Sequence, residues 1–165
     1  MLYPERPKIQ LEKRPQDWAI EIATFVGVLL LIGLPILHYT SLPDTIPIHF
    51  NAKGVADGYG SKGTLLMLPI IGTVMFIGLY ALNRAPHIFN YPVEITEENA
   101  EKQYRNGTSL MRWMNMVMTL SFAFMEWRVI DSSMQGQGDL GAYFLPVFLI
   151  SIFGPIVYFI WKSRN

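Results

Sequence analysis

Four long apolar stretches dominate the pattern of hydrophobic and polar positions along this chain. They cover residues 18–39, 64–82, 108–130 and 141–161, and short polar segments between them hold most of the charged residues. A helix needs roughly 20 apolar residues to cross the hydrocarbon core of a bilayer, and each stretch has about that length. The pattern therefore predicts an all-α membrane protein whose residues 18–165 form a single domain of four transmembrane helices.

The distribution of lysine and arginine predicts how these helices are oriented. Cytoplasmic loops carry the excess of positive charge in most membrane proteins. If both termini are cytoplasmic, ten basic residues lie on or near that side and three lie on the far side. The first group is Arg6, Lys8, Lys13, Arg14, Arg84, Lys102, Arg105, Arg112, Lys162 and Arg164, and the second is Lys53, Lys62 and Arg128. We therefore expect residues 1–17 to be a cytoplasmic tail before a retained membrane anchor, because no small-residue cleavage site follows the first stretch.

Composition excludes several classes of function. The 165 residues carry a formal net charge of zero, whereas a nucleic-acid-binding protein usually has a basic surplus. The chain contains no cysteine, so it has no disulfide framework and no thiolate metal site. The segment GYGSKGT at residues 58–64 is not a phosphate-binding loop, because its order is Lys-Gly-Thr and no buried strand precedes it. No cofactor and no nucleic-acid partner are predicted.

The loop between the first two stretches, residues 40–63, has the pattern of a folded segment. Ile46, Ile48 and Phe50 alternate with polar residues or proline, which predicts a short strand with one apolar face. Asn-Ala-Lys-Gly and Asp-Gly follow as turn sequences. We therefore expect a folded extracytoplasmic loop on the outer end of the helix bundle.

The same loop holds the candidate ligand-binding residues. These are Asp44, His49, Asn51 and Asp57, while Pro43, Pro47, Gly54 and Gly58 are expected to shape the backbone. An alternative is that these residues form a metal site, with His49, the two aspartates and His38 as ligands. Such a site needs three or four converging ligands. Because the spacing shows no ligand pattern, we predict no metal. The favoured interpretation is that the aspartates serve turns and His49 faces water or bonds a carbonyl; no catalytic residue is assigned.

A stripe of polar residues runs along the third stretch. Thr108, Arg112, Asn115, Thr119 and Glu126 fall within about 40° of one line on a helix. Polar groups in a membrane helix normally face the bundle interior, so we expect this stripe to point inward. Arg112 is placed to meet Glu21 of the first helix.

The other end of the stripe and the segment before it carry separate predictions. Glu126 is placed to meet Arg128, Lys62 or the outer loop. Interhelical hydrogen bonding, with both charged groups reaching the interfaces, is favoured over an ion route lined by the stripe. Before the stripe, the sequence Thr96-Glu-Glu-Asn predicts a short surface helix that runs into the third span.

The outer loop also carries a family resemblance. Leu42-Pro43-Asp44, Ile46-Pro47 and His49-Phe50-Asn51, followed by Gly54, Asp57-Gly58 and Ser61-Lys62, resemble a bacterial membrane domain of unknown function in which two spans enclose such a loop. The likeness covers about Thr24 to Leu82. That domain also forms the N-terminal part of Sdp-type toxin-immunity proteins, whose second, Gly-Arg-Thr-type motif has no counterpart after Asn83. The resemblance implies a multi-pass protein of a bacterial cytoplasmic membrane and, in some relatives, immunity to a secreted peptide.

Several functions remain open from the sequence. The leading hypothesis is non-enzymatic binding or sensing through the outer loop, in an immunity-like role, with a secreted peptide or an envelope protein as partner beside the membrane lipid. The second is a small transporter or channel-like protein that uses Arg112, Asn115, Thr119 and Glu126. A membrane enzyme that uses His49 with Asp44 or Asp57, an accessory subunit of a larger complex, and a homo-oligomer are further alternatives.

Overall fold

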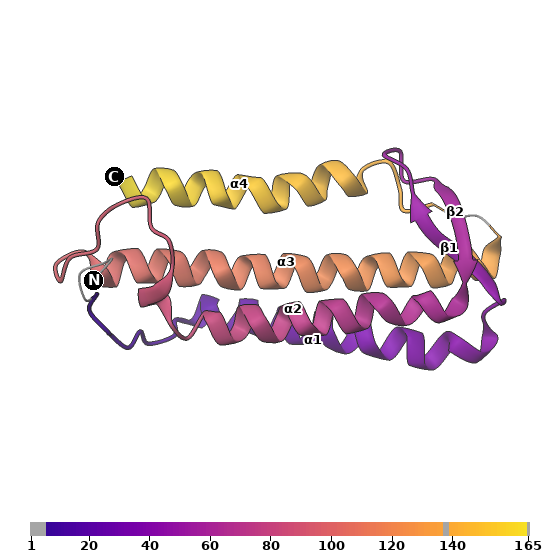
Figure 1. Ribbon diagram of the computed structural model, residues 1–165, viewed down its shortest axis with the longest axis horizontal. Coiled ribbons are helices and arrows are strands. Elements are labelled where there is room, and N and C mark those ends of the chain that lie inside the picture. The colour runs from indigo at the N-terminus through magenta and orange to yellow at the C-terminus, as the bar shows by residue number, and fades with distance from the viewer. Residues whose placement is uncertain (1–5, 137–138, 165) are drawn as a thin grey trace.

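The structure, a computed structural model, describes residues 6–136 and 139–164. Within these residues it contains four long α-helices, α1 (Pro15–His38), α2 (Met67–Leu82), α3 (Ala100–Gln135) and α4 (Phe144–Arg164). The helices run side by side along the length of the molecule, and the strands β1 (Thr45–Phe50) and β2 (Ala56–Ser61) form a hairpin at one end (Figure 1). The protein is therefore mostly helical, with a small two-stranded sheet in the predicted loop.

Three helical segments of the described chain are long and apolar enough to cross a membrane. They are Pro15–Ser41, Lys62–Leu82 and Phe144–Arg164. The second consists of the 3₁₀ helix η2 (Lys62–Leu66) followed by α2, and the Ser61 hydroxyl caps η2 by accepting from the amide of Gly63. The remaining long helix, α3, has 36 residues but is more polar than the other three, because it carries the inward-facing stripe and the charged segment before it.

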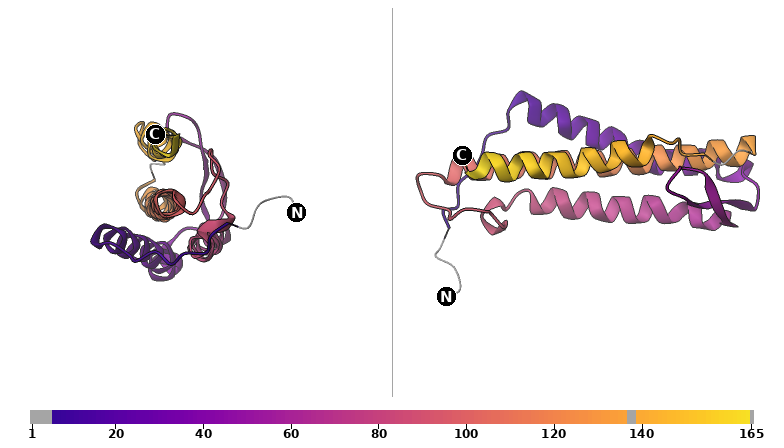
Figure 2. Two further views of the ribbon diagram at one scale, coloured as in Figure 1. Left: turned by 90° about the vertical axis from the view of Figure 1, so that its left-hand side faces the viewer. Right: turned by 90° about the horizontal axis from the view of Figure 1, so that it is seen from above.

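The long helix α3 lies between α4 on one side and the pair α1 and α2 on the other (Figure 2). Small residues allow close packing at this centre. A Cβ on Gly27 of α1 would lie 3.0 Å from the Thr119 hydroxyl, and one on Gly72 of α2 would lie 2.5 Å from the side chain of Leu31. The predicted surface helix and the third span are one continuous helix, since α3 runs from Ala100 to Gln135 without a break. Thr96 and Asn99 bond each other in the turn that precedes it.

The helix α4 packs against α3 through a specific polar contact. Pro155 has no amide proton, so the carbonyl of Ser151 four residues earlier loses its usual helical donor. The indole Nε1 of Trp113 on α3 donates to that carbonyl at 2.9 Å. A proline in a membrane helix thus has its freed carbonyl satisfied by a neighbouring helix.

The hairpin is anchored to the bundle by an apolar cluster. Ile46 is 1% exposed and packs with Leu42, Leu65, Val129 and Ile130. The alternation predicted for β1 fails at two residues, because Pro47 is buried and Ile48 is 49% exposed. Pro47 pairs with Tyr59 and His49 with Gly58, so Ile48 is the extra residue of a β-bulge and turns away from the apolar face.

At the opposite end, the tail before α1 is docked on the loop between α2 and α3. Arg6 donates to the carbonyls of His87 and Phe89, and the Tyr104 hydroxyl donates to the carbonyl of Pro7. Burial raises the pKa of the Tyr91 phenol, which donates to the carbonyl of Pro86. The described part of the predicted tail is therefore an ordered cap on this end; residues 1–5 lie outside the described residues.

Candidate functional site

The hairpin turn is held by side-chain and backbone bonds that make its shape definite. The Asn51 Oδ1 accepts from the amides of Lys53 and Val55, and Gly54 has a φ of 82°. The carbonyl of Gly54 accepts from the amide of Leu140 at 2.7 Å, which ties the turn to the segment between α3 and α4. Asn51 and Gly54 thus shape the loop, and the carboxamide oxygen of Asn51 is already occupied.

Two opposed irregularities of the hairpin bring His49 and Asp57 together. Ile48 is the extra residue on β1, and Asp57 is the extra residue on β2, since His49 pairs with Gly58 and Phe50 with Ala56. The His49 Nδ1 lies 2.5 Å from a carboxylate oxygen of Asp57. A Cβ on Gly58 would lie 2.9 Å from the Cβ of His49, so only glycine allows this approach.

Asp44 lies apart from this pair. Its carboxylate is 3.1 Å from the Lys62 ammonium, which also donates to the carbonyl of Leu42. His49 lies five positions after Asp44 along the chain, which corresponds to roughly 17 Å in an extended strand. Within the described residues, no group of three His, Asp or Glu side chains is placed to hold a metal ion.

The hairpin combines this polar pair with apolar side chains that are exposed to solvent. The pair His49–Asp57 is itself open to solvent. Ile48, Val55 and Tyr59 are also exposed, Tyr59 to 59%. Exposed apolar side chains next to a fixed polar pair are typical of protein-binding surfaces. We call the solvent-exposed surface made by Ile48, His49, Val55, Asp57 and Tyr59 of the hairpin the hairpin face.

The polar stripe of α3 meets a set of partly buried ion pairs near the termini. The Arg112 Nε lies 3.0 Å from a carboxylate oxygen of Glu21, as predicted, and one of its terminal nitrogens lies 3.6 Å from Asp17. Lys13 is 2.5 Å from the second oxygen of Glu21, and Arg14 is 3.1 Å from Asp17. These five side chains form one network of alternating charge between α1 and α3.

Sequence reasoning missed three members of this network. Asp17, Lys13 and Arg14 were assigned to the tail or its boundary, whereas the structure starts α1 at Pro15 and buries Asp17 in its first turn. The sequence did carry a signal: Asp17 lies four residues before Glu21, so a helix starting at Pro15 places both carboxylates on one face.

The middle of the stripe holds helices together. The Asn115 Nδ2 donates to the carbonyl of Phe76 on α2, and the Thr119 hydroxyl donates to the carbonyl of Asn115 within α3. A cavity of about 10 Å³ next to Glu21, Arg112 and Asn115 has room for about one water molecule. The buried Oδ1 of Asn115, which has no donor in the part of the chain that the structure describes, is an acceptor for such a water.

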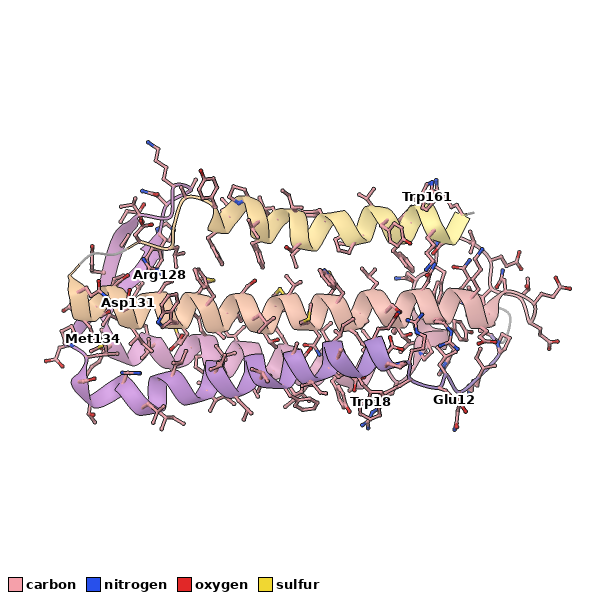
Figure 3. All side chains as sticks on the ribbon, turned by 180° about the vertical axis from the view of Figure 1, so that it is seen from behind. Glu12, Trp18, Arg128, Asp131, Met134 and Trp161 are labelled. Carbon is pink, nitrogen blue, oxygen red and sulfur yellow. The ribbon has the colours of Figure 1, made fainter. Side chains whose placement is uncertain are left out.

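Glu126 points inward as expected, but it lacks the partners that were predicted for it. Its side chain is completely buried, and neither carboxylate oxygen has a hydrogen-bond partner in the described residues. Arg128 instead bonds Asp131 and the carbonyl of Asp139, and Lys62 bonds Asp44. Figure 3 shows Arg128 and Asp131 at the hairpin end of α3. The predicted pairing of Glu126 with Arg128 or Lys62 is therefore wrong, and so is the prediction that it reaches the interface.

Comparisons with known proteins give a family likeness and a relative. Residues 26–73, which include the end of α1 and the whole hairpin, match the model of a family described as a domain of unknown function (DUF1648). A protein of Archaeoglobus fulgidus, described as uncharacterized, is 28% identical over 153 residues, covering 84% of this chain and 82% of the relative. No solved structure matches the chain. The chain is thus similar to a family whose description assigns no function, and the implied immunity stays a prediction.

Proposed function

We propose that the protein crosses the membrane four times and is a non-enzymatic binding protein that recognises a partner through the hairpin face. The four-span arrangement is supported by connectivity. The helix α2 ends near the termini and α4 begins near the hairpin (Figure 1). If both span the bilayer, α3, which joins them, crosses it as well.

The polarity of α3 is compatible with a fourth span. Its charged residues Arg112 and Glu126 are buried against other helices, so lipid does not meet them. Trp18 and Trp161 lie towards the terminal end in Figure 3, as aromatic residues do at a membrane interface. With the basic residues clustered at this end, the termini are cytoplasmic and the hairpin face lies outside, in a bacterial cytoplasmic membrane by the family resemblance.

One observation carries the binding function: the hairpin is fixed to the bundle yet presents its bulges outward. Ile46 is in the apolar cluster and Gly54 is bonded to Leu140, so the backbone is held at both ends. The bulged residues Ile48 and Asp57 nevertheless point to solvent. A rigid extramembrane surface with an aromatic ring, an aliphatic side chain and a His–Asp pair suits a peptide or an envelope protein, because little conformational entropy is lost on binding.

The test is photo-crosslinking in native membranes. A photoreactive residue at Tyr59 is expected to capture one protein or peptide species, which mass spectrometry identifies. His49→Ala and Ile48→Ala in the same background are expected to reduce that capture. A matched control places the photoreactive residue at Ile22 of α1, which is exposed on the membrane side of a helix. If Tyr59 captures only lipid, or the same species as Ile22, the hairpin face is not the binding surface.

Glu126 favours a second candidate, a small transporter. A buried carboxylate without a partner is the type of group that takes up a proton or cation during transport. This candidate predicts that Glu126→Gln abolishes flux in reconstituted vesicles while His49→Ala leaves flux unchanged. Equal flux through the parent protein and Glu126→Gln excludes it.

A further inference from the structure

A hollow between α3 and α4 near the termini combines an apolar floor with a polar, basic mouth. Its volume is about 410 Å³. The floor includes Leu110 and Trp113 of α3 and Phe159 of α4. The mouth includes Asn106, Ser109 and Lys162. We propose that this hollow binds an anionic phospholipid of the adjoining leaflet, with an acyl chain along the floor and the phosphate at Lys162 and Asn106.

Two features of α4 open the hollow. Gly154 has no side chain, and a Cβ there would meet no atom within 4 Å. Pro155, the next residue, cannot donate to the carbonyl of Ser151, which accepts from the indole of Trp113 instead. The contact between the two helices is therefore made by an indole ring rather than by closely packed backbones. The resulting space is lined mostly by carbon atoms, which acyl chains fill well because they need no directional partner.

The mouth of the hollow contains hydrogen-bond donors that could bind a phosphate. The Asn106 Nδ2 is buried and has no acceptor in the described residues. The Lys162 ammonium lies 5.8 Å from the centre of the Tyr158 ring, and no carboxylate of the described chain is within ion-pair distance of it. Arg14 reaches the edge of the mouth by donating to the Ser109 hydroxyl at 2.9 Å, although Asp17 shares its charge.

Charge and position together select an anionic lipid over a neutral one. The groups free to act at the mouth are a cation and an amide donor, and each suits a phosphate oxygen. Lys162 follows Trp161 at the end of an apolar helix, so its ammonium lies at headgroup depth. Basic pockets between membrane helices at this depth are suited to anionic headgroups.

Native mass spectrometry of the purified full-length chain tests this proposal. Phosphatidylglycerol and phosphatidylcholine with identical acyl chains are added in a mild detergent, so that only the headgroup differs. One phosphatidylglycerol per chain is expected to remain bound under conditions that remove phosphatidylcholine. Lys162→Ala is expected to weaken phosphatidylglycerol binding about fivefold, whereas Lys162→Arg restores it.

Matched variants separate the hollow from general lipid contact. Gly154→Phe fills the hollow and is expected to remove the retained lipid, while Gly33→Phe on the open face of α1 is not. Arg164→Ala, two residues beyond Lys162, is the control for loss of charge. Equal retention of the two lipids, equal effects of Lys162→Ala and Arg164→Ala, or a dimer whose interface protects the hollow in place of lipid would each overturn the proposal.

Discussion

The buried acidic residues at the two ends of α3 differ in whether they have ion-pair partners. Near the termini, Glu21 meets Arg112 and Lys13, and the neighbouring Asp17 meets Arg14 and Arg112. Near the hairpin, Glu126 is completely buried, and neither of its oxygens has a partner among the described residues. The same inward-facing stripe thus joins α3 to α1 through ion pairs at one end and contains an unsatisfied carboxylate at the other. Removing a charge is therefore expected to be costly at the first end and cheap at the second.

The largest effect is expected from Arg112→Leu. This change leaves the buried carboxylate of Glu21 with Lys13 alone and takes one of the two cations from Asp17, which costs about 3–5 kcal/mol of unfolding free energy. Detergent-induced unfolding followed by tryptophan fluorescence in mixed micelles measures it. Arg128→Leu, whose side chain bonds at the hairpin end, is the control and should cost far less. Equal losses would show that the ion-pair network has no special role.

The next effect concerns the anchor of the hairpin. Ile46→Ala removes three carbon atoms from a fully buried position and should cost about 2–5 kcal/mol. Ile48→Ala, two residues away in the exposed bulge, should change stability by about 0.5 kcal/mol or less. The same unfolding assay compares them. If both variants lose the same stability, the bulge does not separate an anchoring face from a presenting face.

An intermediate effect is expected at the proline of α4. Trp113→Phe leaves the carbonyl of Ser151 without a donor, which costs about 1–3 kcal/mol. Adding Pro155→Ala restores an amide four residues after Ser151, so the double variant should recover part of the loss. A double-mutant cycle measures this coupling. Strictly additive effects would mean that the indole does not replace the missing amide.

The smallest effect is expected for Glu126→Gln. No hydrogen bond or ion pair within the described residues is lost, so the unfolding free energy should change by less than about 1 kcal/mol or should rise. The comparison is Glu21→Gln at the other end, which breaks two ion pairs and should be clearly destabilising. If Glu126→Gln is as destabilising as Glu21→Gln, the carboxylate has a partner that the described structure does not contain.

Helix positions were predictable because each long apolar run has few alternatives in a membrane. The stripe of α3 also predicted the contact between Arg112 and Glu21, since both enter the bundle at the same depth. The hairpin was predictable only in outline. Period-two alternation assumes regular pairing, and the bulges at Ile48 and Asp57 depend on Gly58 allowing His49 to approach closely.

The remaining features could not be read from residue spacing. Spacing shows that Glu126 faces inward, but whether a cation reaches it depends on how α3 is rotated against its neighbours. The hollow beside α4 likewise depends on the angle between two apolar helices, and either helix alone gives no sign of it. The two cations predicted for Glu126 pair elsewhere: Arg128 with Asp131, three residues away, and Lys62 with Asp44 at the start of the hairpin.

Labelling of single cysteines in intact cells tests the central claim most directly. The chain has no cysteine of its own, so each introduced thiol reports without background. The account predicts that Lys53→Cys in the hairpin turn reacts with a membrane-impermeant maleimide added outside, and that Glu98→Cys, before α3, reacts only after permeabilisation. Tyr143→Cys, before α4, is expected to behave like Lys53→Cys because α3 returns the chain to that side. Labelling of Glu98→Cys and Tyr143→Cys from the same side would show that α3 does not cross the membrane.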